Sequence, residues 1–543
     1  MKKAILLIFI FLCLFISGIL VFYYKGDRNS WLNRTINNFS ARHPGITLNL
    51  KKGTKILDVF YLFHQLIPDK IPTFSLLIKG NDLIRLNSNL PKSGALTEEY
   101  KQSVPAEFIY QGKTYKVKVR YRGDNPNHWL FAKKSWRIKF NDKFAGQESI
   151  NLILPEDRYF FIEPWISRMG QKLGLVTPEL EFVKLEINGL TQGVYLKSEQ
   201  WSKTFLANHG LPEDADLYGE NEFDEPTPDL YADVANFKKY TFDSSRPEEN
   251  VSQLAALLDL LHNASDQEFF NKIPDLVDMD NFLLWQAQAT LGFSHSQKKS
   301  HNLIAYFNPE INKFQFIPWD VAMADEKPVL PDFNYNPLMT RVLTNPNYMF
   351  KRNQILWEYV SNQDNLVDDL DYFDSLYQTT RGAFYRDSIK IFPNLDFDLT
   401  VKKHRSRIVI AQNRIKELLN DAQAVTSVNL NPDFEPSALA YLEIESRGFA
   451  SLSVSEIIVK TNQTPVAFSL IKDVNNNRKI DQADERIKPE NILIHTQRNV
   501  QEYGQPFLLE PVRQGFFITS DQLEKISQID VLLNNAVTKQ PVK

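Results

Sequence analysis

An uncharged, almost wholly apolar run near the N-terminus is the strongest constraint on how this chain can fold. Lys2 and Lys3 precede nineteen residues, Ala4 to Phe22, that carry no charged side chain. At helical rise this run spans about 28 Å, close to the thickness of a bilayer core. The lysines on the short flank favour a cytoplasmic N-terminus, so we expect the rest of the chain to work outside the cytoplasm.

Residues 1–24 have two interpretations, a membrane anchor and a cleavable signal peptide. Tyr23 and Tyr24 follow the apolar run like an interfacial aromatic belt, which favours the anchor. A signal peptide has a shorter apolar core that ends in small residues, and only residues 17–18 hint at such a site. We predict an anchor over 1–24, a stalk over 25–70 and a membrane-anchored, extracytoplasmic location at the cell surface or in the periplasm.

The composition indicates a globular protein that does not use cysteine chemistry. The chain has 543 residues, 43% of them hydrophobic, which is enough for several folded units. Its single cysteine, Cys13, lies in the apolar run, so no disulfide framework or cysteine-ligated metal can form in the remainder. Lys and Arg number 62 against 66 Asp and Glu, and this balance argues against a nucleic-acid partner.

Hydrophobic periods and turn signals divide the remainder into an α+β domain, residues 71–424, and an all-β sandwich-like module, residues 425–543. We expect strands from about 74 to 140 and a helix over 159–173, with the regular helix starting at Pro164 and Gly174 capping it. Asn188-Gly189 predicts a type I′ hairpin turn between strands at 183–187 and 193–196. Further helices are expected at 251–262, 280–291 and within 337–421.

A predicted ribbon over residues 115–140 carries a cationic face. Its apolar and basic side chains alternate, which puts the following on one face: Lys116, Lys118, Arg120, Arg122, Arg137 and Lys139. A cationic face beside the turn at 123–127 suits phosphate groups. A solvated outer sheet face fits the same pattern.

A second predicted hairpin brings an amide and a carboxylate together. Strands at 302–307 and 314–317 flank a turn, and a turn centred on Ile311 places Asn302 opposite Asp320. Two oxygen ligands at that distance can share one Mg²⁺ with phosphate oxygens. The capping of strand ends by these two residues is the alternative.

Five short motifs follow one another along the chain. They are Val-Arg-Tyr-Arg-Gly-Asp (119–124), Ala-Lys-Lys-Ser-Trp-Arg-Ile-Lys-Phe (132–140), Asn-Gly-Leu-Thr-Gln-Gly-Val-Tyr-Leu-Lys-Ser-Glu-Gln (188–200), His-Asn-Leu-Ile-Ala-Tyr (301–306) and Ile-Pro-Trp-Asp (317–320). Together they resemble the spore-coat protein H (CotH) kinase family over about residues 70–420. The resemblance implies a divergent, two-lobed, protein-kinase-like fold that uses ATP and Mg²⁺ to phosphorylate Ser or Thr of surface proteins.

The resemblance also implies roles for individual residues. Nucleotide binding would fall to Arg122, Lys134, Arg137, Lys139 and Glu199, with Glu199 near the adenine. Glu163 would offer a carboxylate to the phosphate-binding lysine. Asn302 and Asp320 would bind Mg²⁺, because phosphoryl transfer depends on positioning and on neutralising phosphate charge.

The chain departs from the family pattern where the catalytic base is expected. Relatives carry an aspartate shortly before the His-Asn pair, whereas residues 293–300 contain no carboxylate. His295 is a candidate base in its place, beside Asp320 as the second catalytic residue. Asp325 is a further candidate acid, and zinc bound by His295, His301 and Asp320 is disfavoured because no helical spacing supports it. The alternative to a kinase is a catalytically silent surface-binding or adhesion protein.

A calcium-like loop lies in the C-terminal module. Oxygen-bearing side chains occupy loop positions 1, 3, 5, 9 and 12, namely Asp473, Asn475, Asn477, Asp481 and Asp484. Lys479 at position 7 would contribute its backbone carbonyl. Arg478 replaces the usual glycine at position 6, which predicts strain at that turn. The loop predicts a structural Ca²⁺ site, with a plain polar turn as the alternative.

Overall fold

The structure, a computed structural model, describes residues 55–91, 96–221, 228–321, 335–430, 440–461, 464–499, 507–520 and 526–542. Within these ranges no helix is long and apolar enough to cross a membrane. The predicted anchor over 1–24, most of the predicted stalk and Asp325 lie outside the described residues.

Seven strands close into a barrel, in the order β1-β2-β3-β4-β5-β7-β6. Their bounds are β1 Thr73–Leu77, β2 Val104–Tyr110, β3 Lys113–Tyr121, β4 Trp136–Phe144, β5 Gln147–Ile153, β6 Leu180–Ile187 and β7 Leu190–Glu199. A parallel pairing of β1 with β6 closes the barrel, and the other neighbours are antiparallel. Aromatic and aliphatic side chains such as Phe74, Phe108 and Ile138 fill it. The strands expected over 74–140 are therefore confirmed.

The predicted alternation in the 115–140 ribbon is also confirmed. Val117 and Val119 point into the barrel, whereas Lys116 and Lys118 are exposed. In the observed register Lys118 faces Lys139 and Arg120 faces Arg137 across the two strands. Cations that stand directly opposite one another repel, which makes this outer face receptive to anions.

Two local predictions beside the barrel can be compared with the structure. Asn188 and Gly189, with φ of 51° and 79°, turn β6 into β7 as the type I′ signal predicted. Helix α5, Ile162–Lys172, begins two residues before the predicted start at Pro164. Proline is tolerated there because the first-turn N–H groups have no intrahelical acceptor. Gly174, with φ of 85°, follows the helix as expected.

A second sheet has the order β11-β10-β8-β9. Its bounds are β8 Asp216–Glu220, β9 Phe237–Thr241, β10 Ile304–Asn308 and β11 Lys313–Phe316. Helices accompany both sheets: α4 Gly80–Ser88, α6 Lys203–Asn208, α7 Ser252–Asn263, α8 Asp266–Leu276 and α9 Met279–Leu291. α7 and α9 match the predicted helices, while α4, α6 and α8 were not predicted.

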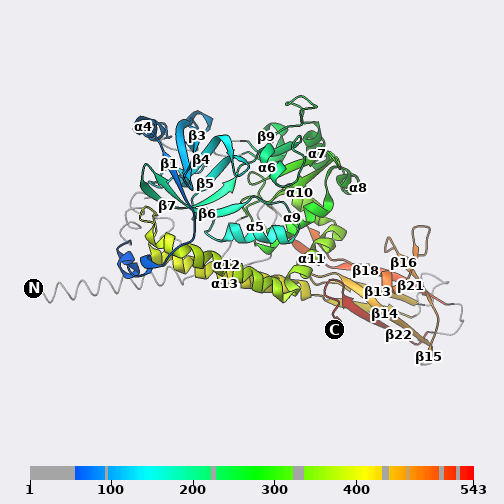
Figure 1. The fold of residues 1–543 in the computed structure, drawn as a ribbon. Helices are drawn as coiled ribbons and strands as arrows, with labels where there is room; N and C mark the ends of the chain where they lie inside the picture. The colour runs from blue at the N-terminus through cyan, green and yellow to red at the C-terminus, as the bar shows by residue number, and fades with distance from the viewer. Residues whose placement is uncertain are drawn as a thin grey trace, which may run out of the picture.

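Long helices run beneath the barrel and the second sheet toward the C-terminal sheets (Figure 1). They are α11 Pro346–Ser361, α12 Gln363–Arg386 and α13 Asn394–Asn420, and the shorter α10 Pro337–Thr344 precedes α11 near α9. Short 3₁₀ segments complete the helical elements: η1 Lys55–Tyr61, η2 His64–Leu66, η3 Glu98–Tyr100, η4 Pro126–His128, η5 Leu230–Ala232, η6 Val234–Asn236 and η7 Pro489–Asn491.

A buried ion pair ties the barrel to the end of α12. Lys133 Nζ lies 2.6 Å from Asp387 Oδ2, and the two side chains are 2% and 0% exposed. The same carboxylate oxygen accepts the Val194 N–H at 3.1 Å, and Lys390 Nζ donates to the Asp387 carbonyl. Burial alone would raise the pKa of Asp387, but the charge of Lys133 and its hydrogen bond lower it below the ordinary value. Asp387 therefore stays ionised in the interior beside Lys133.

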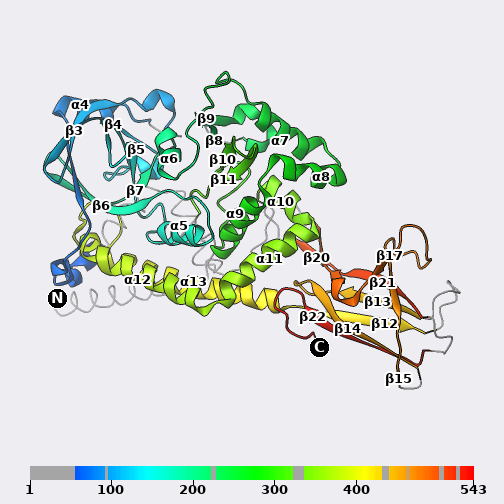
Figure 2. The ribbon, with the colours of Figure 1, turned by 45° about the vertical axis from the view of Figure 1, so that its right-hand side comes forward.

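Beyond α13 the chain is built from strands, as predicted for residues 425–543. Their bounds are β12 Ala424–Asn429, β13 Ala440–Ser446, β14 Leu452–Thr461, β15 Thr464–Pro465, β16 Ser469–Asp473, β17 Glu485–Ile487, β18 Leu493–Ile494, β19 Gln497–Asn499, β20 Leu508–Glu510, β21 Val512–Thr519 and β22 Gln528–Asn535. One sheet has the order β12-β13-β21-β16-β17, and β14 pairs with β15, β18 and β22 in another. Residues of both sheets share one core, including Leu442, Val454 and Phe516. Figure 2 shows these sheets at the end of the molecule opposite the barrel.

Candidate functional site

Loops from the barrel, from the start of α5 and from the second sheet bring charged side chains together. Arg158 lies between β5 and α5, and Glu163 is in the first turn of α5. Glu220 ends β8, while Asn302 precedes β10 and Asp320 follows β11. The last two residues adopt the left-handed conformation, with φ of 63° and 51°. Asn and Asp tolerate that conformation better than most residues, so both turns suit their sequence.

Asp320 is held by Arg158 and Glu163. Arg158 Nη1 forms an ion pair with Asp320 Oδ1, and the guanidinium lies 4.9 Å from the ring centre of Trp319. The Asp320 N–H donates to Glu163 Oε1 at 3.0 Å. Arg158 is 5% exposed and Asp320 is 27% exposed. Only the carboxylate of Asp320 therefore faces outward from this pair.

Burial raises the pKa of Glu163 to about 8, with Asp320 adding to the rise and Arg158 opposing it. Glu163 Oε2 is shielded from solvent and has no hydrogen-bond partner. An unpaired oxygen on a buried carboxyl group is satisfied by a proton or by a cation. The Glu163 carboxyl group is thus either protonated at neutral pH or one ligand of a bound cation.

Glu220 brings Asn302 to the same place. Its Oε2 accepts the Asn302 N–H, and the Asn302 side-chain amide donates to the Ser296 carbonyl at 3.0 Å. Burial raises the pKa of Glu220 to about 7, and the negative charges of Asp320 and Asp124 add to this. Asn302 and Asp320 therefore flank a single acidic cluster.

A cationic side faces these carboxyl groups. Arg122 follows β3, and its Nε and Nη1 are shielded and without hydrogen-bond partners. Burial and the neighbouring Arg158 lower the pKa of Arg122 to about 10. Burial and the two arginines also lower the pKa of His128 to about 3, so this histidine is neutral. Two neighbouring guanidinium groups repel unless an anion lies between them, so this side is suited to a phosphate.

The glycine beside Arg122 is required by the local geometry. Gly123 has φ of 91°, and a Cβ on it would overlap the ring of His128. The His128 ring is fixed by Ser135 Oγ at 2.9 Å from Nδ1 and by Asp157 Oδ2 at 3.3 Å from Nε2. Only glycine lets the chain turn here while this ring packs beneath Arg122.

The predicted register of the second hairpin is wrong by one residue. Ala305 pairs with Phe316 and Asn308 with Lys313, so Asn302 is not placed opposite Asp320. The loop has four residues rather than an odd number, with Asn312 left-handed at φ of 55°. The two site residues still approach one cluster, because both lie beyond the strand ends and contact side chains from α5 and β8.

The other residues expected to bind nucleotide are spread over the barrel. Lys139 is exposed on β4, and Arg137 Nε donates to Asn151 Oδ1 at 3.0 Å on the same outer face. Lys134 lies elsewhere, in a cavity of about 180 Å³ that Tyr121 and Trp136 also line. Its ammonium donates to the Phe131 carbonyl at 2.5 Å. The cation beside Glu163 is thus Arg158 rather than the expected lysine.

Glu199 ends the barrel strand β7, just before the chain crosses to α6 and the second sheet. The carboxylate is 3% exposed and accepts hydrogen bonds from three donors: Gln147 Nε2 at 3.1 Å, the Glu179 N–H at 2.9 Å and His209 Nε2 at 2.7 Å. Burial opposes ionisation, yet the hydrogen bonds from His209 and from the Glu179 N–H lower the pKa of Glu199. Glu199 thus lies where the chain leaves the barrel for the second sheet, and its place near an adenine stays a prediction.

Comparison with known proteins decides the family. Residues 119–387 match the family described as CotH kinase protein. They form a CotH-family domain. The chain is 25% identical over 263 residues to the inner spore coat protein H of Bacillus subtilis (strain 168), which covers 46% of this chain and 68% of that protein. A solved structure, the Helicobacter pylori proinflammatory kinase CtkA, matches 54% of this chain and 96% of its own at 13% identity, with a TM-score of 0.20 that is too low to bear on the fold.

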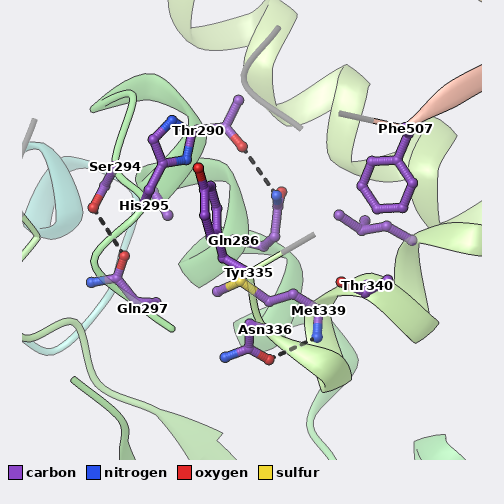
Figure 3. A pocket seen from close by; sticks show the side chains of 12 residues that line it. Gln286, Thr290, Ser294, His295, Gln297, Tyr335, Asn336, Met339, Thr340 and Phe507 are labelled. Atoms are coloured by element: carbon purple, nitrogen blue, oxygen red, sulfur yellow. Dashed lines mark hydrogen bonds between the residues drawn. The ribbon is translucent and has the colours of Figure 1, made fainter. Parts of the chain in front are cut away.

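His295 of the CotH domain lies in a small separate pocket of about 30 Å³ (Figure 3). Its ring centre is 4.6 Å from that of Tyr335, and Ser294 Oγ donates to Gln297 Oε1 nearby. Phe507, from the C-terminal module, lines the same pocket. Gln297 in turn donates to the carbonyl of Trp319, the residue before Asp320. The loop of His295 is therefore joined to the acidic cluster by this hydrogen bond and by the one from the Asn302 amide to the Ser296 carbonyl. The role of His295 as a base stays a prediction.

No group of three or more His, Cys, Asp or Glu side chains that could hold a metal is found within the described part of the chain. The donors that fit Mg²⁺ at the CotH site are Asp320, Asn302 and the unpaired Glu163 Oε2, a mixed oxygen set. Mg²⁺ takes one or two protein oxygens and completes its shell with water and phosphate. The residues present therefore suit Mg²⁺ with a bound phosphate better than a metal held by protein alone.

The predicted calcium loop joins β16 to β17. Asp473 is fully buried, and its carboxylate accepts the Asn477 and Arg478 N–H groups and the Tyr441 hydroxyl. The Asn475 and Asn477 amides donate to Asp481 Oδ2 at 3.0 and 2.9 Å. Asp484 accepts the N–H groups of Val474 and Asp481, and Lys479 donates its N–H to Asn477 Oδ1. Arg478 is left-handed with φ of 60°, so the strain predicted at position 6 is confirmed.

Sequence reasoning missed Arg158 and Glu220. Arg158 stands in the connection Pro155–Tyr159, which has no period, and Glu220 closes a short strand in which it is the last residue. Their one sequence signal was a single charged residue at the end of a strand or just before a helix. Functional side chains are often found on the loops at such positions.

Proposed function

We propose that the CotH domain binds a nucleoside triphosphate with Mg²⁺ and transfers its terminal phosphoryl group to a hydroxyl of a surface protein or another surface acceptor. The barrel and the second sheet would act as the two lobes around the nucleotide, with Glu199 at their crossing. The observation that carries this proposal is the Arg122 guanidinium, whose Nε and Nη1 are shielded and without hydrogen-bond partners, close to Arg158, which is itself paired with Asp320.

The chain's own residues have distinct tasks in this proposal. Arg122 would donate to phosphate oxygens, and the outer cations Arg137 and Lys139 would raise the local concentration of the anion. Asp320 and Asn302 would present oxygens to Mg²⁺, whose charge neutralises the phosphates during transfer. His295, or the loop that carries it, would accept the proton of the attacking hydroxyl.

A specific observation favours a second candidate, a silent phosphate-binding surface protein. The 293–300 loop lacks a carboxylate, and Asp320 is paired with Arg158. Such a protein would bind the nucleotide, or another phosphate-bearing surface molecule, without turnover. The residues that bind phosphate are the same in both cases, so binding tests the site and turnover separates the two functions.

The cellular setting is part of the proposal. Residues 4–22 would anchor the chain in a membrane, and the domain would act outside the cytoplasm on a surface acceptor. A purified mature chain that starts near residue 24 and is released in soluble form would contradict the anchor.

Nucleotide binding to the full chain in detergent, with Mg²⁺ and with a chelator, tests the site. Arg122→Gln should weaken binding about tenfold to a hundredfold, as expected when a hydrogen bond to a charged group is lost. Arg85→Gln is the matched control, because that guanidinium is 56% exposed and pairs with Asp82 on α4. Equal affinity in both variants, or an affinity that ignores Mg²⁺, would contradict the proposed site.

A further inference from the structure

Six large apolar side chains stand out into solvent at the beginning of the described chain. The segment over residues 55–66, which forms η1 and η2, is here called the N-terminal 3₁₀ segment. Its exposed apolar residues are Ile56, Val59, Phe60, Leu62, Phe63 and Leu66, with exposed fractions between 55% and 84%. Soluble proteins rarely leave such a continuous apolar surface uncovered.

Three polar side chains of this segment, Lys55, Asp58 and Tyr61, point the other way, into the protein, whereas His64 is exposed. Lys55 Nζ donates to the carbonyls of Ser388 and Lys390, Asn394 donates its N–H to Asp58 Oδ1 at 2.7 Å, and the Tyr61 hydroxyl donates to Asp398 Oδ2 at 2.8 Å. A 3₁₀ segment repeats every three residues, so 55, 58 and 61 share the inner face while 56, 59 and 62 share the outer one. On these two faces the usual arrangement, apolar side chains inward and polar side chains outward, is inverted.

Hydrogen bonds hold this segment to the protein, so its apolar side chains are left available for contact with another apolar surface. None of the six outward side chains is charged, and Lys51 and Lys52 lie shortly before the segment in the sequence, separated from it by Gly53 and Thr54. Phenylalanine and leucine beside basic residues are the composition of elements that lie in the headgroup region of a bilayer. The predicted anchor ends at Phe22, only 32 residues before Lys55.

We propose that the N-terminal 3₁₀ segment lies on the membrane surface with Phe60, Phe63 and their apolar neighbours inserted among the headgroups. This inference rests on the proposed anchor, because the tether keeps the segment at a high effective concentration near the bilayer. A weak contact then suffices to orient the domain. Figures 1 and 2 show η1 and the C-terminal sheets at opposite ends of the molecule, so the β module would point away from the membrane.

Site-directed spin labelling of the full chain tests this contact. The chain has one cysteine, so Cys13→Ser gives a background in which Phe63→Cys carries a single label. Leu532→Cys is the matched control, an apolar residue 51% exposed on β22 of the distant module. Each labelled chain is reconstituted into vesicles of phosphatidylethanolamine with a minority of phosphatidylglycerol. Collision of the label with oxygen and with a water-soluble nickel chelate is then compared with the same variant lacking residues 1–24, in buffer without vesicles.

At position 63 vesicles should lower nickel collision several-fold and raise oxygen collision, while position 532 should not change. A vesicle-bound chain with a nickel-accessible label at 63 would overturn the membrane contact and leave the anchor standing. A chain that stays off the vesicles would overturn both. A label at 63 that is equally shielded without vesicles would show that another part of this chain, or a second copy, covers the surface, which also overturns the proposal.

Discussion

Replacing Glu163 by glutamine should stabilise the protein at alkaline pH relative to acid pH. The native carboxyl is 7% exposed, and burial, with Asp320 adding and Arg158 opposing, raises its pKa to about 8 from an ordinary value of 4.5. Glutamine has the shape of the protonated carboxyl and keeps an acceptor for the Asp320 N–H at 3.0 Å. The substitution therefore removes a titration while preserving the local contact.

The sign follows from proton binding. A carboxyl whose pKa is raised on folding binds more protons in the folded state than in the unfolded state. Its contribution is complete below the unfolded pKa, near 4.5, and is lost as pH rises through the folded value near 8. At about 1.4 kcal/mol per pKa unit, this shift sets a ceiling of about 5 kcal/mol on the pH-dependent loss. The pKa near 8 already includes the opposing charge of Arg158, so we expect an effect of a few kcal/mol, below this ceiling.

Thermal unfolding followed by tryptophan fluorescence measures the effect in the full chain, from about pH 5 to about pH 9. A few kcal/mol corresponds to a shift of several degrees for a domain of this size. The Tm of Glu163→Gln minus that of the unmodified chain should rise across this range. Glu268→Gln, an exposed carboxylate on α8 that pairs with Lys272, should give a flat difference. A flat difference for Glu163→Gln would refute the inference that the native carboxyl is protonated near neutral pH.

Three further outcomes are expected. Asp320→Asn should weaken Mg²⁺-dependent nucleotide binding more than Asp368→Asn, a carboxylate that pairs with Arg168 on the protein surface, as titration with and without a chelator will measure. In an active kinase His295→Ala should slow transfer about 10²–10⁴-fold with nucleotide affinity nearly unchanged, and full activity would remove this residue from the mechanism. Ca²⁺ should raise the Tm of the β module by several degrees, and Asp473→Ala should abolish the rise; identical melting curves in calcium and chelator would leave the loop a polar turn.

Local patterns predicted the elements well. The two-residue period of Tyr115–Arg122 is visible in the letters because each side chain of a strand faces opposite to the next. Asn188-Gly189 fixes a two-residue turn through its left-handed backbone. Barrel closure was beyond reach, since it depends on the pairing of β1 with β6, which lie more than one hundred residues apart. Nothing local encodes that contact.

The site residues likewise fall into those that local sequence patterns indicate and those that only long-range contacts bring together. Arg122, Asn302 and Asp320 stand at strand ends in recognisable motifs, and the structure gathers them at one acidic cluster. Arg158 and Glu220 lie outside any hydrophobic period of the sequence. They belong to the site because the distant residues Asp320 and Asn302 contact them in the folded chain. The one-residue error in the 302–317 register arose because an even-numbered loop shifts the pairing relative to an odd one.

The buried pair of Lys133 and Asp387 limits where this protein can be truncated or recombined with another sequence. Asp387 is the last residue of the 119–387 match and the C-cap of α12, so a single carboxylate fastens the end of the domain to a loop near its beginning. A chain that stops before it would leave an ammonium group in the interior without a counter-charge, at a cost of about 3–5 kcal/mol. Recombination within α12 would therefore yield an unstable product, whereas the β module could be exchanged beyond α13 without disturbing this bond. A recombined domain is therefore expected to be stable only when it contains both Lys133 and Asp387.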